Sequence, residues 1–349
     1  MRRGACSGSA TPRPSCRSLW ERPARRCERF WRAWPGVGIN GGITAGPWAE
    51  LAVSAAGGLP SPGAVGRHED LRLNLAEVHD RIAAAAAAAG RAPGELTLVA
   101  VSKTWPAADV VVLCGLGVTD FAENREQEAR LKVADVTKHF FDSEVSAASR
   151  SGSGDIVRGD RAGGPGRAGG HPPSSRSSSL PVPLVSSQPS SPLCWHFVGR
   201  LQRNKARSVT RWAHWVQSVD RAPLVTALST AAVAHGREIV VCLQVSLDSH
   251  GGDVGRGGAS PADIPALGDL VAGSPGLVLA GVMGVAPRDV PARPAFAGLR
   301  EVSDMLRREH PDASVISAGM SGDLAVAVAE GATHLRIGTA LFGQRRGVP

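Results

Sequence analysis

The sequence predicts an α/β protein built as a single (β/α)8 TIM-type barrel. Eight short runs of apolar and β-branched residues recur along the chain, and Ala-rich stretches of helical character separate most of them. Strands that alternate with helices of this length pair in parallel. No G-x-G-x-x-G motif follows the first strand. Its absence favours a closed barrel over the alternative, an open Rossmann-like sheet.

The expected elements follow one another in a regular order. The first helix is expected over residues 71–89, because Leu71, Leu75, Val78 and Ile82 recur at helical spacing. Strands are expected over residues 96–103, 120–124, 194–199, 215–219, 239–246, 278–285, 315–319 and 334–339. Helices are expected between them, over residues 107–116, 126–136, 224–235, 261–272, 295–310 and 323–330.

Two segments depart from this pattern. Residues 1–66 are rich in Arg, Gly, Pro and Ser, which predicts a disordered extension. Their acid-poor composition also has some likeness to a transit peptide, which is the alternative. Residues 143–191 are of low complexity and are expected to form a surface insertion, because the regular pattern resumes at Leu193. The barrel is therefore expected over residues 67–346.

The charge and cysteine content limit the possible functions. A net charge of +8 suggests a nucleic-acid partner, but residues 1–66 carry nine arginines against three glutamates, so most of the excess lies there. No apolar run reaches membrane-spanning length. The six cysteines show no C-x-x-C spacing, so no metal site is expected. We expect a cytoplasmic monomer that binds neither nucleic acid nor membranes.

Lys103 is the first candidate for chemistry. The chain contains only four lysines against 35 arginines, and Lys103 directly follows the apolar run Val-Ala-Val-Ser. A lysine beside a buried sheet has its ammonium form disfavoured, which is the condition for forming a Schiff base. Lys132 and Lys138 are instead interpreted as solvated surface residues. The competing interpretation of Lys103 itself is an exposed lysine at a strand end.

A second group of residues predicts a phosphate site. Ser321 lies in the segment Gly-Met-Ser-Gly-Asp before a helix, and Arg336, Gly338 and Thr339 lie in the last expected strand, which Gly338 and Thr339 close. Backbone N–H groups at helix starts bind phosphate, and barrels commonly bind it after strands seven and eight. Plain helix capping by Ser321 and Asp323 is the alternative.

These segments together closely resemble the YggS/PROSC family of pyridoxal-phosphate-binding proteins, also called PLP homeostasis proteins. The resemblance covers roughly residues 70–142 and 193–344. It rests on A-V-S-K-T at 100–104, F-A-E-N-R-E-Q-E at 121–128, H-F-V-G-R-L-Q-R-N-K at 196–205, S-V-D-R at 218–221, G-V-M at 281–283, G-M-S-G-D at 319–323 and R-I-G-T-A-L-F-G at 336–343.

The resemblance implies a fold like the N-terminal barrel of alanine racemases, and pyridoxal 5′-phosphate (PLP) as the cofactor. It implies that Lys103 forms the Schiff base and that Ser321, Arg336, Gly338 and Thr339 hold the phosphate. By the same mapping, Asn124 lies near the cofactor and Met283 lines the pocket. The family usually has Gly in place of Ala122 and often Tyr in place of Arg125, and often Asn in place of Ser246. These departures leave the contacts to the ring face open.

Three functions are weighed against one another. The resemblance favours a PLP carrier or homeostasis protein that has no catalytic residues and whose possible partners are PLP-dependent apoenzymes. The alternative is a PLP-dependent enzyme such as an amino-acid racemase, and the third possibility is a barrel that binds phosphate only. The related racemases use a Tyr from a second, C-terminal β domain, whereas this chain contains no Tyr. We therefore expect a barrel without that domain that binds PLP and is not an enzyme.

Overall fold

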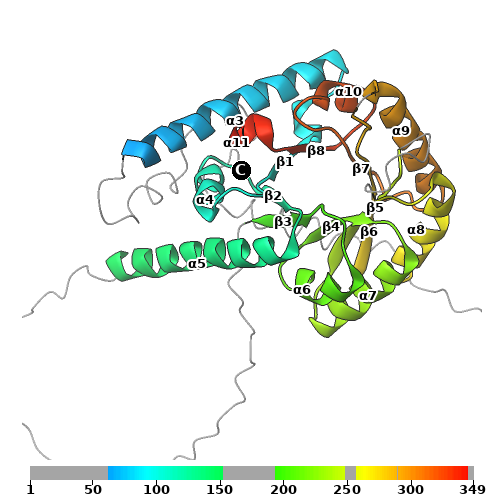
Figure 1. Ribbon diagram of the computed structural model, residues 1–349, viewed down its shortest axis with the longest axis horizontal. Helices are drawn as coiled ribbons and strands as arrows, with labels where there is room; N and C mark the ends of the chain where they lie inside the picture. Colours follow the sequence, from blue (N-terminus) through cyan, green and yellow to red (C-terminus); the bar gives the residue numbers. More distant parts are fainter. Residues whose placement is uncertain (1–61, 152–192, 248–256, 289, 345–349) are drawn as a thin grey trace, which may run out of the picture. The chain divides into compact units, whose positions relative to one another are not determined.

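The computed structural model of the protein describes residues 62–151, 193–247, 257–288 and 290–344. Eight parallel strands close into one barrel in their order along the chain, which confirms the predicted fold class (Figure 1). β1 pairs with both β2 and β8, so that Val99 lies opposite Asp120 on one side and Arg336 on the other. The strands are β1 (Thr97–Val101), β2 (Asp120–Glu123), β3 (Cys194–Phe197), β4 (Trp215–Val219), β5 (Ile239–Gln244), β6 (Leu277–Met283), β7 (Val315–Ser317) and β8 (His334–Ile337).

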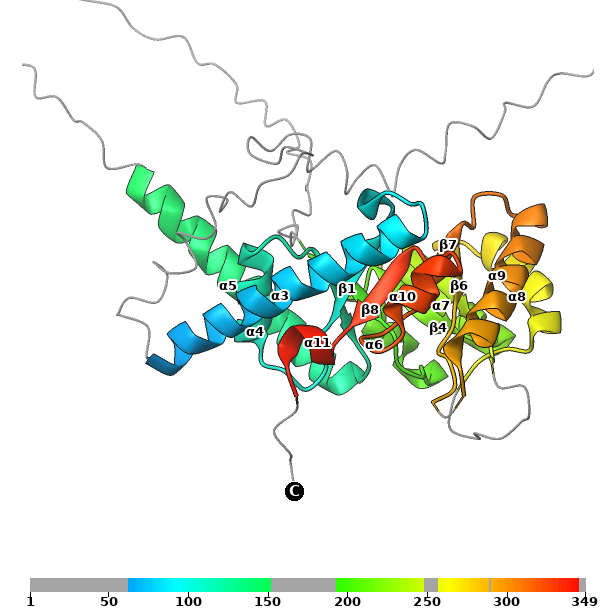
Figure 2. The same cartoon turned by 90° about the horizontal axis from the view of Figure 1, so that it is seen from above.

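Helices surround the strands in Figure 1, and Figure 2 shows α3 lying along α11 and α10. Among the described residues, no helix combines the length and the apolar character needed to cross a membrane. The α-helices are α3 (Pro62–Ala88), α4 (Ala107–Gly115), α5 (Glu126–Ser151), α6 (Ala206–Val209), α7 (Ala222–Ala234), α8 (Ile264–Ala272), α9 (Ala292–Glu309), α10 (Leu324–Ala329) and α11 (Thr339–Phe342). Short 3-10 helices are η2 (Pro93–Glu95), η3 (Arg203–Lys205) and η4 (Pro261–Asp263).

Several predicted boundaries differ from the structure. Seven of the eight strands end one or two residues earlier than the apolar runs suggested. The last strand was expected to reach Thr339, but α11 begins there. Residues 62–66 belong to α3 and residues 143–151 to α5, although both stretches were expected to be irregular. Residues 1–61 and 152–192, the rest of the extension and of the insertion, lie outside the described residues.

The strands separate two apolar regions. The larger region lies between the barrel wall and the helices, and includes Phe121, Trp195 and Leu335. The interior is filled by alternate residues of the strands, which form smaller clusters: Val99, Val101 and Ala122 with Val198, and Cys242, Ala280 and Met283 with Trp215, Val240, Val285 and Val315. Because successive strand residues point to opposite faces, this alternation determines which polar residues face the interior.

Candidate functional site

Lys103 lies in the turn that follows β1, two residues after Val101, and is half-buried. Val99 and Val101 both belong to the interior cluster, so Lys103 occupies the next position of the same alternation. Beyond the end of β1, the Ser102 N–H still donates to the Ala122 carbonyl at 3.0 Å. This bond continues the pairing of β1 and β2 and holds the turn at the carboxyl end of the barrel.

Asn124 directly follows β2 and lies beside this turn. Its amide oxygen is buried and has no hydrogen-bond partner. Gly199, after β3, approaches so closely that a Cβ atom there would lie 2.0 Å from the Asn124 carbonyl oxygen. A buried polar atom without a partner is uncommon in folded proteins and indicates a group that a ligand can satisfy. The Asn124 side chain therefore fits a ligand site at this end of the barrel.

The predicted phosphate residues are brought together by a hydrogen bond between two loops. The Ser321 hydroxyl accepts a bond from the Ala340 N–H at 3.1 Å, so the segment after β7 contacts the start of α11. The alternative interpretation required Ser321 and Asp323 to cap α10 through their side chains. Neither side chain does so. The Asp323 carboxylate instead accepts from the Met320 N–H at 2.5 Å. From α3, Arg81 donates to the Ser321 carbonyl.

The start of α11 also lies next to β1. A Cβ atom at Gly338 would lie 3.4 Å from the Val101 carbonyl oxygen, so this residue is beside the end of the strand that precedes Lys103. Thr339 begins α11 and is exposed. Ser321, Gly338 and Thr339 therefore lie on the β7 and β8 side of Lys103, and Asn124 lies on the β2 side.

Arg336 and Met283 form part of the buried floor beneath these loops. The Arg336 guanidinium donates to the Ser317 hydroxyl at 2.7 Å and to the Gly284 carbonyl at 2.8 Å. Gly284 directly follows Met283, which is buried in the interior cluster. Burial lowers the pKa of Arg336 to about 10, so the guanidinium carries its charge at neutral pH in a region shielded from water.

A chain of hydrogen bonds runs from Arg336 through the barrel interior. Arg336 can only donate, so the Ser317 hydroxyl accepts from it and donates to the Gln217 carbonyl oxygen at 2.8 Å. The Gln217 amide nitrogen then faces His196 Nδ1 at 2.8 Å, and His196 Nε2 lies 3.0 Å from Asp120. Because every link donates in the same direction, His196 carries its hydrogen on Nε2. The chain links the floor of the predicted site to the opposite end of the barrel.

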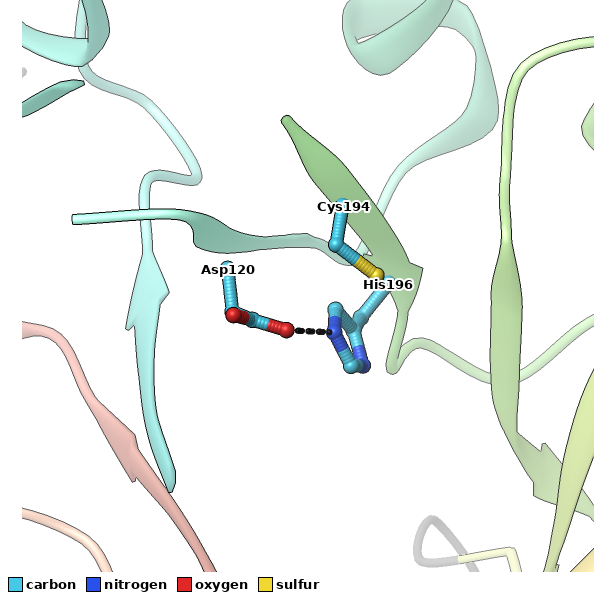
Figure 3. A group of neighbouring side chains, drawn as sticks. All are labelled: Asp120, Cys194 and His196. Carbon is cyan, nitrogen blue, oxygen red and sulfur yellow. Dashed lines mark hydrogen bonds and ion pairs between the residues drawn. The ribbon is translucent and has the colours of Figure 1, made fainter. Parts of the chain in front are cut away.

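Asp120, Cys194 and His196 form a group whose potential ligand atoms lie within 4.8 Å of one another (Figure 3). Asp120 and Cys194 are the first residues of β2 and β3, so the group lies at the end of the barrel away from Lys103. A metal would need the lone pair of a ring nitrogen. In His196, however, Nε2 donates toward Asp120, and Gln217 occupies Nδ1. We therefore assign Asp120 and His196 to the interior hydrogen-bond chain and propose no metal site at this group.

The prediction that Lys132 is a solvated surface residue is wrong. Lys132 is buried and its ammonium lies 2.6 Å from the carboxylate of Glu123, which is fully buried. The sequence does contain a pattern that indicates burial of Lys132. Ala129, Lys132, Val133 and Val136 follow the i, i+3, i+4, i+7 spacing of a buried helix face. Lys138, on the same helix, is exposed as expected.

Comparison with known proteins gives consistent results. Residues 73–346 match the family model described as "Alanine racemase, N-terminal domain". The pyridoxal phosphate homeostasis protein of Mycobacterium tuberculosis is 38% identical, covering 80% of this chain and 95% of that protein. Its namesake in Pseudomonas aeruginosa is 36% identical, with 78% and 94% covered. The structure of PipY from Synechococcus elongatus with PLP bound has a TM-score of 0.56 at 28% identity, and covers 78% of this chain and all of PipY.

Proposed function

The chain belongs to the alanine racemase N-terminal domain family and, within it, to the pyridoxal phosphate homeostasis proteins, and from this membership we propose that it binds PLP and contributes to its homeostasis. The finer part of the proposal is that Lys103 holds PLP as a Schiff base. The relatives are named for homeostasis and not for a reaction, which supports a role in binding. PLP-dependent apoenzymes are the partners that such a role implies.

One observation carries the proposal for the site. The buried, unpartnered amide oxygen of Asn124 and the half-buried Lys103 lie at the same end of the barrel, on the adjoining ends of β2 and β1. A polar atom in this state is costly unless something binds it. A compact polar molecule placed between these side chains can satisfy it.

The residues at this end match the chemical parts of PLP. Lys103 supplies the amine for the aldehyde, and the Ser321 hydroxyl with the backbone N–H groups at the start of α11 supplies donors for the phosphate. Arg336 would supply a fixed positive charge in the buried floor of the site, and Met283 would supply an apolar surface there. When bound, PLP supplies an electrophilic carbonyl and an electron-withdrawing ring. Asn124 would offer its unpartnered amide oxygen to the cofactor beside the lysine.

The proposal is tested by absorbance. Purified protein mixed with PLP is expected to develop a band at about 420 nm, the signature of a protonated Schiff base. Lys103→Ala is expected to abolish the band, because Lys103 is the lysine that follows β1 at this end of the barrel. Borohydride reduction followed by peptide mapping should place the pyridoxyl group on the peptide containing Lys103. A band that persists in Lys103→Ala, or a label on another lysine, contradicts the assignment.

The same preparations distinguish the alternatives. Sustained racemisation of alanine by the pure protein would contradict a role restricted to binding. A protein that binds inorganic phosphate but forms no 420 nm band would support the phosphate-only barrel. Transfer of PLP to an apoenzyme, measured as recovery of that enzyme's activity, is expected if the protein supplies the cofactor to others.

A further inference from the structure

A buried ion network lies directly behind Lys103. The Lys132 ammonium donates to the Glu123 carboxylate at 2.6 Å and to the Ser102 carbonyl at 2.7 Å, and lies 3.3 Å from the Glu128 carboxylate. An ammonium has three N–H donors, and these three partners can use all of them. Lys132 therefore joins α5 to the turn that follows β1.

The network holds the backbone on both sides of Lys103. On one side, the Ser102 hydroxyl donates to Glu123 at 2.7 Å while the Ser102 carbonyl accepts from Lys132. On the other side, the Thr104 N–H donates to the Glu128 carboxylate at 2.5 Å. Thr104 has a φ of 69°, the only positive value at a non-glycine residue in the described part of the chain. A β-branched residue rarely adopts this conformation unless its surroundings impose it.

The network acts from the helix side of the barrel wall. Glu123 lies between Ala122, which packs in the barrel interior, and Asn124. Successive strand residues point to opposite faces, so Glu123 points away from the interior and toward Lys132 on α5. Lys132 and Glu128 thus reach the backbone at residues 102 and 104, and Glu123 holds the Ser102 hydroxyl and the Lys132 ammonium from the same side.

Stability alone is a poor explanation for this network. A buried ion pair is often no more stabilising than apolar residues of the same volume. Burial raises the pKa of Glu123, and its second carboxylate oxygen has no partner. Such a group costs stability, whereas directional bonds fix geometry. Reaction rates depend on geometry, since an error of about 1 Å in the position of a reacting group lowers a rate by up to about a hundredfold.

We propose that Lys132, Glu123 and Glu128 are positioning residues that fix the backbone of Lys103, so that its amine is presented to the aldehyde of PLP. The inference rests on the proposed function. It adds that the reactivity of Lys103 depends on an ion network on the other face of the barrel wall. Glu128 offers the cleanest test, because it is only half-buried and its loss does not leave a fully buried charge unpaired.

Glu128→Ala removes the acceptor of the Thr104 N–H, and Glu128→Gln keeps an oxygen at that position. In Glu128→Ala without PLP, amide hydrogen exchange at Thr104 is expected to be about tenfold faster. On mixing with PLP, the 420 nm band is expected to form about tenfold more slowly, and Glu128→Gln should recover much of both effects. Asp135→Ala, at an exposed position of the same helix, is the matched control.

Lys132→Met removes the ammonium at the centre of the network. Lys138→Met, at an exposed position of α5, is its control. If Lys132→Met unfolds, the Glu128 variants still decide the question. In one outcome, the wild-type protein forms the 420 nm band while Glu128→Ala shows the same amide exchange at Thr104 and the same rate of band formation. That result overturns the positioning role and leaves the proposed function intact. A wild-type protein that forms no band contradicts the proposed function and the positioning role with it.

Discussion

Gly199 controls how closely the ends of β2 and β3 approach each other. Its missing side chain leaves room for the Asn124 carbonyl, which would lie 2.0 Å from a Cβ atom at this position. The obstructing atom belongs to the backbone, so a substitution must move the chain at Asn124. Because the Asn124 amide oxygen is the unpartnered atom of the candidate site, its position depends on this glycine.

Gly199→Ala is therefore expected to lower the free energy of unfolding by about 2 kcal/mol, a typical cost of overpacking. It should also weaken PLP binding. Urea denaturation and PLP titration measure the two effects. Gly298→Ala is the control, because Gly298 lies within α9 with no neighbouring atom near its Cβ position. There alanine should stabilise the protein by about 0.5–1 kcal/mol. Equal stabilities for the two variants would contradict the expectation.

The two lysines show what residue patterns can and cannot predict. Lys103 is a candidate because it follows an apolar strand run and strand ends collect functional residues in this fold, and the structure places it in the turn after β1; its role stays a prediction. Lys132 was predicted to be solvated because it is a lysine, although its spacing places it on the buried face of α5. Its partner Glu123 is nine residues away and on another element. A pairing of this kind depends on how α5 packs against the barrel, which local spacing does not determine.

At the scale of elements, α3 anchors α11. Arg67 of α3 donates to the Asp109 carboxylate of α4 at 2.6 Å and to the Phe342 carbonyl of α11 at 3.0 Å. The Trp105 ring stacks on the Phe342 ring with centroids 5.8 Å apart, and the Arg67 guanidinium lies 4.7 Å from the Trp105 centroid. These contacts hold the four-residue helix whose start forms part of the proposed phosphate site.

Arg67→Ala is expected to destabilise the protein by about 2 kcal/mol, because the buried Asp109 carboxylate and the Phe342 carbonyl lose a charged donor. It should also weaken phosphate-dependent binding, so the affinity for PLP should fall more than that for pyridoxal. Urea denaturation and fluorescence titration measure these effects. Arg72→Ala, on the same helix, removes an exposed ion pair with Glu69 and should change stability little. If it matched Arg67→Ala, the anchoring role would be wrong.

Element types were easier to predict than their ends. All eight strands were identified, since each is a short apolar run between helical stretches. The carboxyl ends of seven strands were placed too late because apolar residues continue into the loops, as Val198 does after β3. The end of α5 was missed for a different reason. Residues 143–151 are mostly Ser, Ala and Arg without an apolar face, so periodicity gave no indication that the helix continues.

At the scale of the whole barrel, the two ends have different electrostatic character. The carboxyl end carries Lys103 and the start of α11, which are in contact with solvent. The opposite end holds imidazoles that burial keeps uncharged. Burial lowers the pKa of His334 to about 4, and that of His214 to about 4 as well. His334 lies against Trp215, with ring centroids 5.3 Å apart, and its Nδ1 is 3.0 Å from the Thr333 hydroxyl.

This difference predicts acid sensitivity. In the unfolded chain these imidazoles bind protons below the usual histidine pKa of about 6.5, whereas in the folded protein they do so only near pH 4. Between these values the unfolded state binds more protons, so the free energy of unfolding decreases as the pH falls. Each histidine is expected to contribute a loss of about 2 kcal/mol between pH 7 and pH 5. Urea denaturation at the two pH values measures the loss.

His334→Gln isolates one contribution. Glutamine keeps a hydrogen-bonding group near the Thr333 hydroxyl and does not titrate, so the variant should lose about 2 kcal/mol less than the wild type between pH 7 and pH 5. The charged and titratable groups around His334 are His196, Asp120 and Arg336. The bond to His196 lowers the pKa of Asp120 against the effect of burial, so the Asp120 carboxylate stays ionised in this range. An equal pH dependence in both proteins would show that His334 binds protons equally in the folded and unfolded states, so that its pKa is not lowered by burial and acid instability must arise elsewhere in the barrel.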